Sequence, residues 1–143
     1  MTMDPSLQKV VESISALMAE MESQAFADER FAELSMRQTL YLNTILRLEH
    51  PNFSDLAREL GVTKPSVTAI VSTLIRKGYV QKVQDGEDRR AYHILPTRKA
   101  EEFNQIHTAI HKRLADFLSA QLDANEVQQL AGLLGKSLQG IKR

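Results

Sequence analysis

The sequence predicts a mainly α-helical fold with a small β-hairpin, and three observations carry that prediction. Apolar residues recur at steps of three and four over most of the 143 residues, as they do along one face of a helix. A glycine turn separates two short segments of this kind near the middle of the chain. Beyond it, two short runs rich in aromatic and β-branched residues flank an Asp-Gly dipeptide, which is typical of a hairpin.

The first two helices are expected in the N-terminal third of the chain. Residues 7–21 carry a single apolar stripe and are predicted to form the first helix. The second helix is predicted to begin after Ser35, because its hydroxyl and the side chain of Gln38 suit a capping box, and to end at His50-Pro51. The side chains expected to point inward from the second helix are Leu40, Tyr41, Thr44, Ile45 and Leu48.

Two short helices are expected to meet at a tight turn. Ser54 is the predicted cap of the first, which ends at Gly61 because glycine adopts the left-handed conformation without a Cβ penalty. Thr63 is the predicted cap of the second, and Pro65 falls in its first turn, where a missing N–H costs nothing. The expected inward side chains are Leu56, Ala57 and Leu60 on the first helix and Val67, Ile70, Val71 and Leu74 on the second.

The hairpin and two further helices complete the chain. Residues 79–84 and 91–95 are predicted as its strands. Thr97 is expected to cap a long helix, and Asp123 with Glu126 to cap the last one. The long helix carries its apolar residues along one side, at Phe103, Ile106, Ile110, Leu114, Phe117 and Leu118.

Composition excludes several classes of protein. The chain has no cysteine, so disulfides, thiolate metal sites and thiol chemistry are excluded. No apolar run is long enough for a membrane span and none resembles a signal peptide, so we expect a soluble, cytoplasmic protein without a membrane partner. The net charge is zero, but residues 53–99 hold nine basic and five acidic side chains, as a localised phosphate-binding surface would need.

A helix, a glycine turn, a second helix and a hairpin form the organisation of a winged helix-turn-helix, whose second helix can enter the major groove of DNA. The predicted burial of Val67, Val71 and Leu74 leaves the other face of that helix for small or cationic side chains suited to base edges and phosphates. An ordinary solvated helix face is the alternative interpretation. The residues of that outer face are Lys64, Ser66, Thr68 and Ser72, and the free N–H groups at its Thr63 end could hold a phosphate.

Three strings give the chain a resemblance to the MarR family of winged-helix transcriptional regulators, which extends over essentially the whole sequence. They are LARELGVTKPSVT at residues 56–68, LIRKG at residues 74–78 and DRRA at residues 88–91. The first string alone is shared with many regulators, whereas the string in the hairpin, or wing, together with long terminal helices is specific.

The resemblance implies a homodimer in which the first and last helices interlock and two recognition helices read a palindrome. It divides the chain into an N-terminal dimerisation helix and connection at residues 1–34, a winged helix-turn-helix DNA-binding lobe at residues 35–96 and C-terminal dimerisation helices at residues 97–143. The apolar faces of the terminal helices could equally pack within one chain.

The resemblance also assigns roles in the wing. Asp85 and Asp88 match acidic positions of the family, Asp88 orients an arginine, and Arg89 or Arg90 is free to enter the minor groove. The chain departs from the family at Glu87 and at Ala69, where relatives often carry arginine. The DNA-binding residues expected are Thr63, Lys64, Pro65, Ser66, Thr68, Ser72, Arg89 and Arg90.

Small-molecule and metal sites are weaker predictions. The resemblance suggests a cleft for an aromatic effector, which Met36, Tyr41, Phe53 and Phe103 could line, although plain core is the favoured interpretation of all four. His107 and His111 lie one helical turn apart and could ligate one Zn²⁺, although two solvated histidines are favoured. His50 and His93 are interpreted as isolated surface or satisfied residues.

No motif of an enzyme or a cofactor site is found. The sequence therefore favours a sequence-specific regulator of transcription that binds double-stranded DNA. We expect a repressor that acts as a homodimer on a palindromic operator and that a small molecule releases. The alternatives are a zinc-responsive regulator of the same fold and a winged-helix protein-interaction module without DNA binding.

Overall fold

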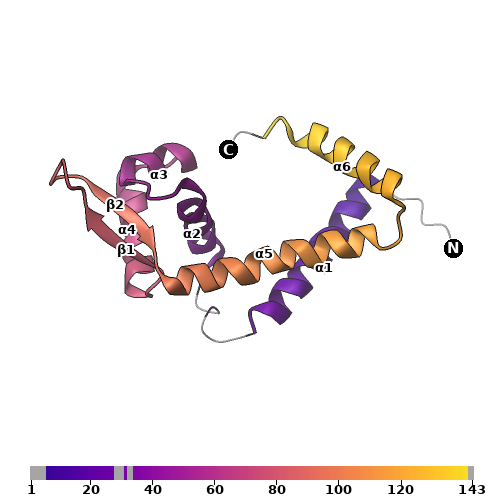
Figure 1. The fold of residues 1–143 in the computed structure, drawn as a ribbon, viewed down its shortest axis with the longest axis horizontal. Coiled ribbons are helices and arrows are strands. Elements are labelled where there is room, and N and C mark those ends of the chain that lie inside the picture. The colour runs from indigo at the N-terminus through magenta and orange to yellow at the C-terminus, as the bar shows by residue number, and fades with distance from the viewer. Residues whose placement is uncertain (1–5, 28–30, 32–33, 142–143) are drawn as a thin grey trace. The chain divides into compact units, whose positions relative to one another are not determined.

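The computed structural model describes residues 6–27, 31 and 34–141, and its elements follow the predicted order (Figure 1). The mainly α fold with one antiparallel hairpin is confirmed. Residues 1–5, 28–30, 32–33 and 142–143, which belong to the predicted terminal regions, lie outside the described residues. The elements are α1 (Leu7–Ala25), α2 (Met36–Leu48), α3 (Phe53–Leu60), α4 (Lys64–Arg76), β1 (Val80–Gln84), β2 (Tyr92–Pro96), α5 (Arg98–Ser119) and α6 (Ala124–Leu138).

The contacts of the chain divide it into two compact units. The first unit runs from residue 30 to residue 105 and contains α2, α3, α4, both strands and the first turns of α5. The second unit contains α1, the remainder of α5 from residue 106, and α6. No helix among the described residues has the length and apolar character needed to cross a membrane.

Three of the predicted helix caps are confirmed, because each satisfies backbone N–H groups at a helix start through a side chain close in sequence. Ser35 and Gln38 form a reciprocal capping box at the start of α2, with both hydrogen bonds at 3.1 Å. Thr63 caps α4 by accepting from the Ser66 amide. Asp123 and Glu126 form the box that starts α6.

The predicted cap of α3 is wrong, because the helix begins at Phe53 and Ser54 lies inside its first turn. Asn52 is the cap: its Oδ1 accepts from the Asp55 amide at 2.7 Å, and Asp55 Oδ2 accepts from the Asn52 amide at 3.0 Å. A carboxylate three residues after the cap lets both backbone N–H groups be satisfied. Ser54 has Ala57 at that spacing, which offers no such acceptor.

The core of the first unit comes from α2, α3, α4, the hairpin and the start of α5. Leu40 is 55% exposed, so the prediction that it points inward is wrong, and Leu42 is fully buried instead. The buried face of α2 is therefore rotated about the helix axis relative to the predicted face, away from Leu40 and toward Leu42. The buried side chains of this unit include Tyr41, Leu42, Ile45, Leu56, Val67, Val71, Leu74, Tyr79, Val80, Ile94, Ala100 and Phe103.

The hairpin starts and ends close to its predicted limits. Both strands begin one residue later than predicted, β1 at Val80 and β2 at Tyr92. The register pairs Val80 with Pro96 and Val83 with His93. The chain before α3 adds to the free edge of β2, since the Ile94 amide donates to the Pro51 carbonyl at 2.8 Å. This pairing fixes the hairpin to the start of α3.

The residue before α5 connects that helix to the hairpin. The hydroxyl of Thr97 lies 2.6 Å from the Gly78 carbonyl and 3.0 Å from the Tyr79 carbonyl, to which it can donate. The sequence predicts that Thr97 caps α5, whereas the contact found ties the start of α5 to the segment between α4 and β1. Tyr79 is buried beside Phe103, with ring centroids 6.2 Å apart.

The second unit buries few side chains and leaves much apolar surface exposed. Met21 of α1 and Ile110 of α5 are buried. Large apolar side chains of the same unit are exposed, and they recur at helical spacing on α1 and α6. They are Leu7, Val11, Phe117, Leu130, Leu133, Leu134, Leu138 and Ile141.

Candidate nucleic-acid interface

The turn between α3 and α4 fixes the angle between these two helices. Gly61 has φ 64°, a left-handed conformation that a side chain at this position would strain. The Val62 amide donates to the Ala57 carbonyl at 3.0 Å and closes the turn. Leu56 of α3 and Val67 of α4 are fully buried, so their packing holds the helices together.

The exposed face of α4 carries the side chains that the sequence predicts for contact. Lys64, Thr68 and Ser72 follow one another at steps of four, so they share one side of the helix, and all three are exposed. Pro65 is exposed beside them, and Ser66 is half-buried. Lys64, Thr68 and Ser72 therefore share the exposed face, whereas Ser66 lies on another side of the helix.

Three hydroxyls at the start of α4 have defined partners. Thr63 Oγ1 lies 3.0 Å from Ser66 Oγ and accepts from the Ser66 amide at 3.3 Å. The Thr68 hydroxyl donates to the Lys64 carbonyl at 3.0 Å. Because its proton is used within the helix, Thr68 offers oxygen lone pairs and a methyl group to a ligand.

The turn of the wing is built around the carboxylate of Asp85. Its Oδ1 accepts from the amides of Glu87 at 2.7 Å and Asp88 at 3.3 Å. The Asp85 amide donates to the Ala91 carbonyl at 2.9 Å. These hydrogen bonds, together with the contact to His93 described below, hold the pKa of Asp85 down at about 2.

The two arginines of the wing differ in their surroundings. Asp88 Oδ1 accepts from the Arg90 amide at 3.0 Å and lies 3.6 Å from Arg90 Nε, so Arg90 is an arginine that Asp88 contacts. The Arg90 side chain is 94% exposed, and such an exposed ion pair contributes little to stability. Arg89 is exposed as well. Both guanidinium groups are therefore accessible from solvent.

A cleft of about 230 Å³ lies where the wing meets the starts of α3 and α4. Lys64 and Arg90 bring cationic groups to its lining, and Phe53 and Tyr92 bring aromatic rings. The ammonium of Lys82 lies 4.3 Å from the centre of the Tyr92 ring, a cation–π contact. The full lining is Asn52, Phe53, Ser54, Lys64, Asp88, Arg90, Ala91 and Tyr92. Sequence reasoning missed this cleft, because its walls come from three separate segments.

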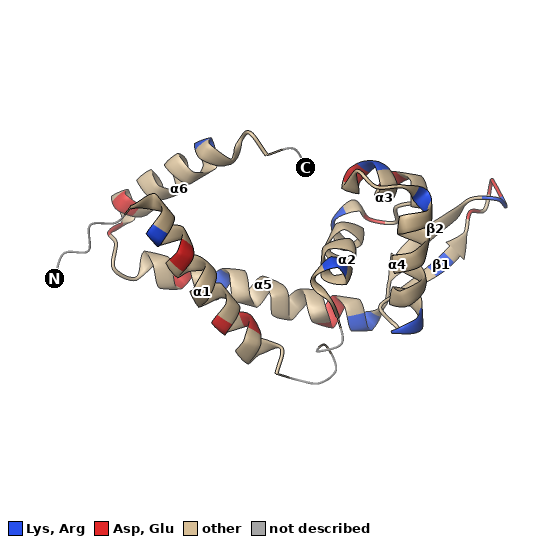
Figure 2. Ribbon diagram, turned by 180° about the vertical axis from the view of Figure 1, so that it is seen from behind, with Lys and Arg blue, Asp and Glu red and all other residues tan. Residues whose placement is uncertain are grey.

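Charge differs between the elements of this surface. The hairpin and α3 carry Lys or Arg together with Asp and Glu, whereas α4 carries Lys and Arg without an acidic residue (Figure 2). Among the described helices, α1 carries mostly Asp and Glu (Figure 2). A surface that presents cations beside a polar helix face attracts anionic ligands such as phosphates.

The four residues predicted to line an effector cleft are not brought together. Tyr41 and Phe103 are buried in the core, as the favoured interpretation has it. Met36 is 92% exposed on α2, so its interpretation as core is wrong, and Phe53 belongs to the cleft beside the wing. The Tyr41 hydroxyl is buried without a hydrogen-bond partner among the described residues.

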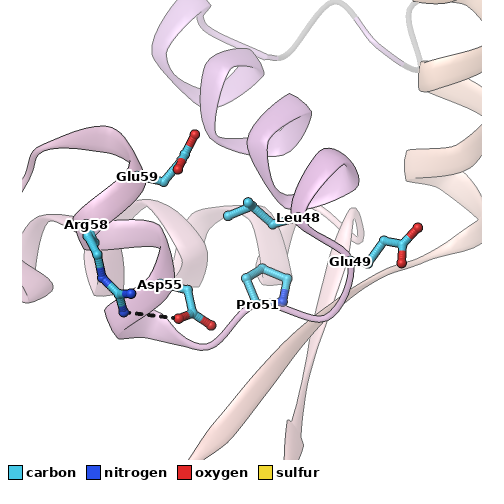
Figure 3. A pocket seen from close by; sticks show the side chains of 6 residues that line it. All are labelled: Leu48, Glu49, Pro51, Asp55, Arg58 and Glu59. Carbon is cyan, nitrogen blue, oxygen red and sulfur yellow. Dashed lines mark hydrogen bonds and ion pairs between the residues drawn. The ribbon is translucent and has the colours of Figure 1, made fainter. Parts of the chain in front are cut away.

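A second cleft, of about 200 Å³, lies between the end of α2 and α3 (Figure 3). Its carboxylates are partly neutralised, because Asp55 pairs with Arg58 at 3.3 Å and Glu59 pairs with Arg47 at 2.6 Å. Glu49, with φ 50°, also lines it. This cleft does not include the exposed face of α4.

The predicted histidine pair is present on α5, but its surroundings do not make a metal site. The ring centroids of His107 and His111 are 4.4 Å apart. Burial and the neighbouring His111 lower the pKa of His107, while Glu22 opposes this shift. Within residues 6–27, 31 and 34–141, no group of three or more His, Cys, Asp or Glu side chains is placed to hold a metal ion.

His50 is exposed and the ring of His93 is satisfied by hydrogen bonds, as interpreted, but His93 is not isolated. His93 Nε2 lies 2.7 Å from Asp85 Oδ2, and His93 Nδ1 lies 3.0 Å from the His50 carbonyl. Both contacts raise the pKa of His93 above its usual value, and the contact with Asp85 contributes more than the contact with the His50 carbonyl. No local pattern could have revealed the contact with the His50 carbonyl, because His50 and His93 are far apart in the sequence.

Comparison with known proteins agrees with this architecture. Residues 34–92 match the model of the MarR family. Streptococcus pneumoniae FabT, in a crystal structure with DNA, is 23% identical, covers 94% of this chain and 96% of its own, and superposes with a TM-score of 0.74. A MarR protein from Peptoclostridium difficile is 26% identical over 99% of this chain and 90% of its own, with a TM-score of 0.64. An S. aureus MepR mutant bound to an oligodeoxyribonucleotide is 22% identical over 94% of this chain and 97% of its own, with a TM-score of 0.68.

Proposed function

From the match of residues 34–92 to the model of the MarR family, we propose that the chain is a sequence-specific regulator of transcription that binds double-stranded DNA. One observation carries the proposal: the exposed face of α4 and the arginines of the wing both lie on the first unit, beside a cleft that Lys64 and Arg90 line. The relatives whose structures contain DNA or an oligodeoxyribonucleotide support it.

In this proposal α4 is the recognition helix and enters the major groove. Lys64 contacts a backbone phosphate, and the free N–H groups at the Thr63 end of the helix support the same contact. Ser66, Thr68 and Ser72 contact base edges, with the Thr68 methyl group available to a thymine methyl. Pro65 packs at the first turn without needing an N–H partner.

The wing adds a second point of attachment. Arg89 and Arg90 are exposed, and the narrow minor groove attracts guanidinium groups by its negative potential. Asp88 sets the direction of the Arg90 side chain through the contacts described above. A helix in one groove and an arginine in the next fix the register of the protein on the duplex.

The active species in this proposal is a homodimer that acts as a repressor on a palindromic operator. The apolar faces of α1 and α6 are exposed in the single chain, and a second copy would cover them. Two recognition helices related by a two-fold axis read half-sites about one helical turn apart. Bound across an operator, such a dimer hinders transcription, and a small molecule that changes the spacing of the two helices would release it.

Selection of bound fragments from a random duplex library tests the proposal. We expect a two-fold symmetric motif to be enriched, with half-site centres about one helical turn, or a multiple of it, apart. A set of recovered fragments no more alike than the starting library would contradict sequence-specific binding. The winged-helix module without DNA binding would give that second result.

A further inference from the structure

His93 faces a hydrogen-bond acceptor with each of its ring nitrogens. On one side Nδ1 lies 3.0 Å from the main-chain carbonyl oxygen of His50. On the other side Nε2 lies 2.7 Å from a carboxylate oxygen of Asp85. Both distances are those of hydrogen bonds, so each nitrogen requires a hydrogen atom or a donor opposite it.

Neither partner can supply that donor. A main-chain carbonyl only accepts, and an ionised carboxylate only accepts as well. Asp85 is ionised at neutral pH, because its own pKa is about 2. A neutral imidazole carries one N–H and would leave a lone pair facing one of the two oxygens. Only the imidazolium, with a hydrogen on both nitrogens, satisfies both contacts.

These contacts connect the wing to the segment that precedes α3. Through Asp85, His93 reaches the amides of Glu87 and Asp88, which form the turn directly before the wing arginines. His50, whose carbonyl is the other partner, has φ 51°, a backbone conformation that costs energy for residues other than glycine. The contacts of His93 with Asp85 and with the His50 carbonyl are called the His93 bridge below.

The charged groups around the ring favour its protonated form. Asp85 faces it from the wing turn, and the Asp55 carboxylate of α3 acts in the same direction. From the segment after α2 the contact is the His50 carbonyl, and the neighbouring Glu49 side chain is exposed. On β1 the cation is Lys82, which belongs to the opposite face of the hairpin by register.

We propose that His93 is a positioning residue of the wing that acts as an imidazolium, so that loss of its proton frees the wing turn and weakens the hold on DNA as pH rises. The part of this inference that concerns DNA rests on the proposed function. The part that concerns the proton does not, and it can be measured on the protein alone.

Nitrogen NMR of the histidine rings in the full chain tests the proton. We expect both ring nitrogens of His93 to stay protonated above about pH 6.5, where an unperturbed imidazole has lost one proton. The Asp85→Asn variant supplies an amide N–H opposite Nε2, so a neutral ring then fits and His93 should titrate at lower pH than in the parent. Glu87→Gln removes the same charge from the same turn without touching the bridge, and should leave the titration of His93 at the parent's midpoint. A titration midpoint of His93 in the parent no higher than about 6.5, or one that is unchanged in Asp85→Asn, would overturn the proposal.

Binding to a duplex recovered from the random library tests the consequence for DNA. Affinity of the parent should fall as the pH is raised from about 5.5 to about 8.5, across the range in which histidine loses its proton. This fall should be lost in His93→Gln and in Asp85→Asn and kept in Glu87→Gln. The same pH profile in the parent and in His93→Gln would overturn the role in DNA binding while leaving the regulator itself in place. If no duplex is recovered but the NMR result holds, the proposed function fails and the imidazolium bridge stands.

Discussion

Asp85 and His93 are joined by a contact of 2.7 Å between Oδ2 and Nε2 that crosses from the wing turn to the second strand. The second oxygen of the same carboxylate accepts the amides of Glu87 and Asp88. One side chain thus organises the tip of the hairpin and connects it to the sheet. The fold places this pair beside the two wing arginines, so its effect on stability and its effect on binding can be measured separately.

Both residues of this pair should make the free energy of unfolding depend on pH, since His93 loses its contribution at high pH and Asp85 loses its contribution at low pH. The pKa of His93 is raised in the folded protein, so its contribution is complete below the unfolded value of about 6.5 and is lost as pH rises through the folded pKa. The pKa of Asp85 is lowered to about 2, so its contribution is complete above about 3.8 and is lost as pH falls toward 2. Urea denaturation of the parent and of His93→Gln should therefore differ most between about pH 4 and pH 6.5. A difference that grows above neutral pH would contradict this sign.

The start of α3 should depend on Asn52 and little on Ser54. Asn52→Ala removes the side-chain acceptor for the Asp55 amide and should lower the free energy of unfolding by about 1 kcal/mol. Ser54→Ala changes a residue within the first turn and should cost no more than about 0.5 kcal/mol. Urea denaturation of both variants under one condition gives the comparison. A larger loss for Ser54→Ala would contradict the assignment of the cap.

The apolar stripe of α6 should hold two copies of the chain together. Leu134 and Leu138 lie four residues apart and are 43% and 54% exposed in the single chain. Glutamate at both positions would bury charge in the proposed interface, so the double variant should sediment as a monomer whereas the parent sediments as a dimer. Gln129→Glu adds a charge to an exposed position on another face and should remain dimeric. A parent that is monomeric at concentrations where it binds DNA would contradict the homodimer.

Two residues of α4 should affect binding in different ways. Lys64→Ala removes a proposed phosphate contact, so it should weaken binding to all duplexes alike and lower the salt dependence by about one counterion. Thr68→Ala should instead change which bases are preferred, because the proposed contact of Thr68 is with base edges. Repeated selection from the random library, with affinities measured over a range of salt, separates the two effects. An unchanged base preference in Thr68→Ala would show that Thr68 does not read the sequence.

Local patterns predicted much of the fold. Ser35, Thr63 and Asp123 were predicted as helix caps because a cap and its partner lie three residues apart. The hairpin followed from an Asp-Gly turn between strand-forming runs, and the exposed face of α4 followed from helical spacing. Each of these features is decided within a few residues of sequence.

The wrong cap of α3 has a local cause, because Asn52 and Asp55 stand at the spacing of a capping box, whereas the other errors have non-local causes. Leu40 has the same character as Leu42, and only the packing of α2 against its neighbours decides which of them is buried. The cleft beside the wing and the His93 bridge join segments that are far apart in the chain. The sequence does not distinguish packing of the apolar faces of α1 and α6 against the same chain from packing against a second copy. The helical spacing of their apolar residues is the same in both cases.

The most direct test of the central claim, that α4 and the wing together hold duplex DNA, is an affinity measurement with matched charge changes. The variant Lys64→Ala/Thr68→Ala/Arg89→Ala/Arg90→Ala removes the proposed contacts, and Lys9→Ala/Arg113→Ala/Lys136→Ala removes the same number of cations from the second unit. At physiological salt, on a duplex recovered from the library, the first variant should lose at least about 100-fold in affinity while the second binds within about threefold of the parent. Equal losses in the two variants, or a first variant that binds like the parent, would contradict the claim.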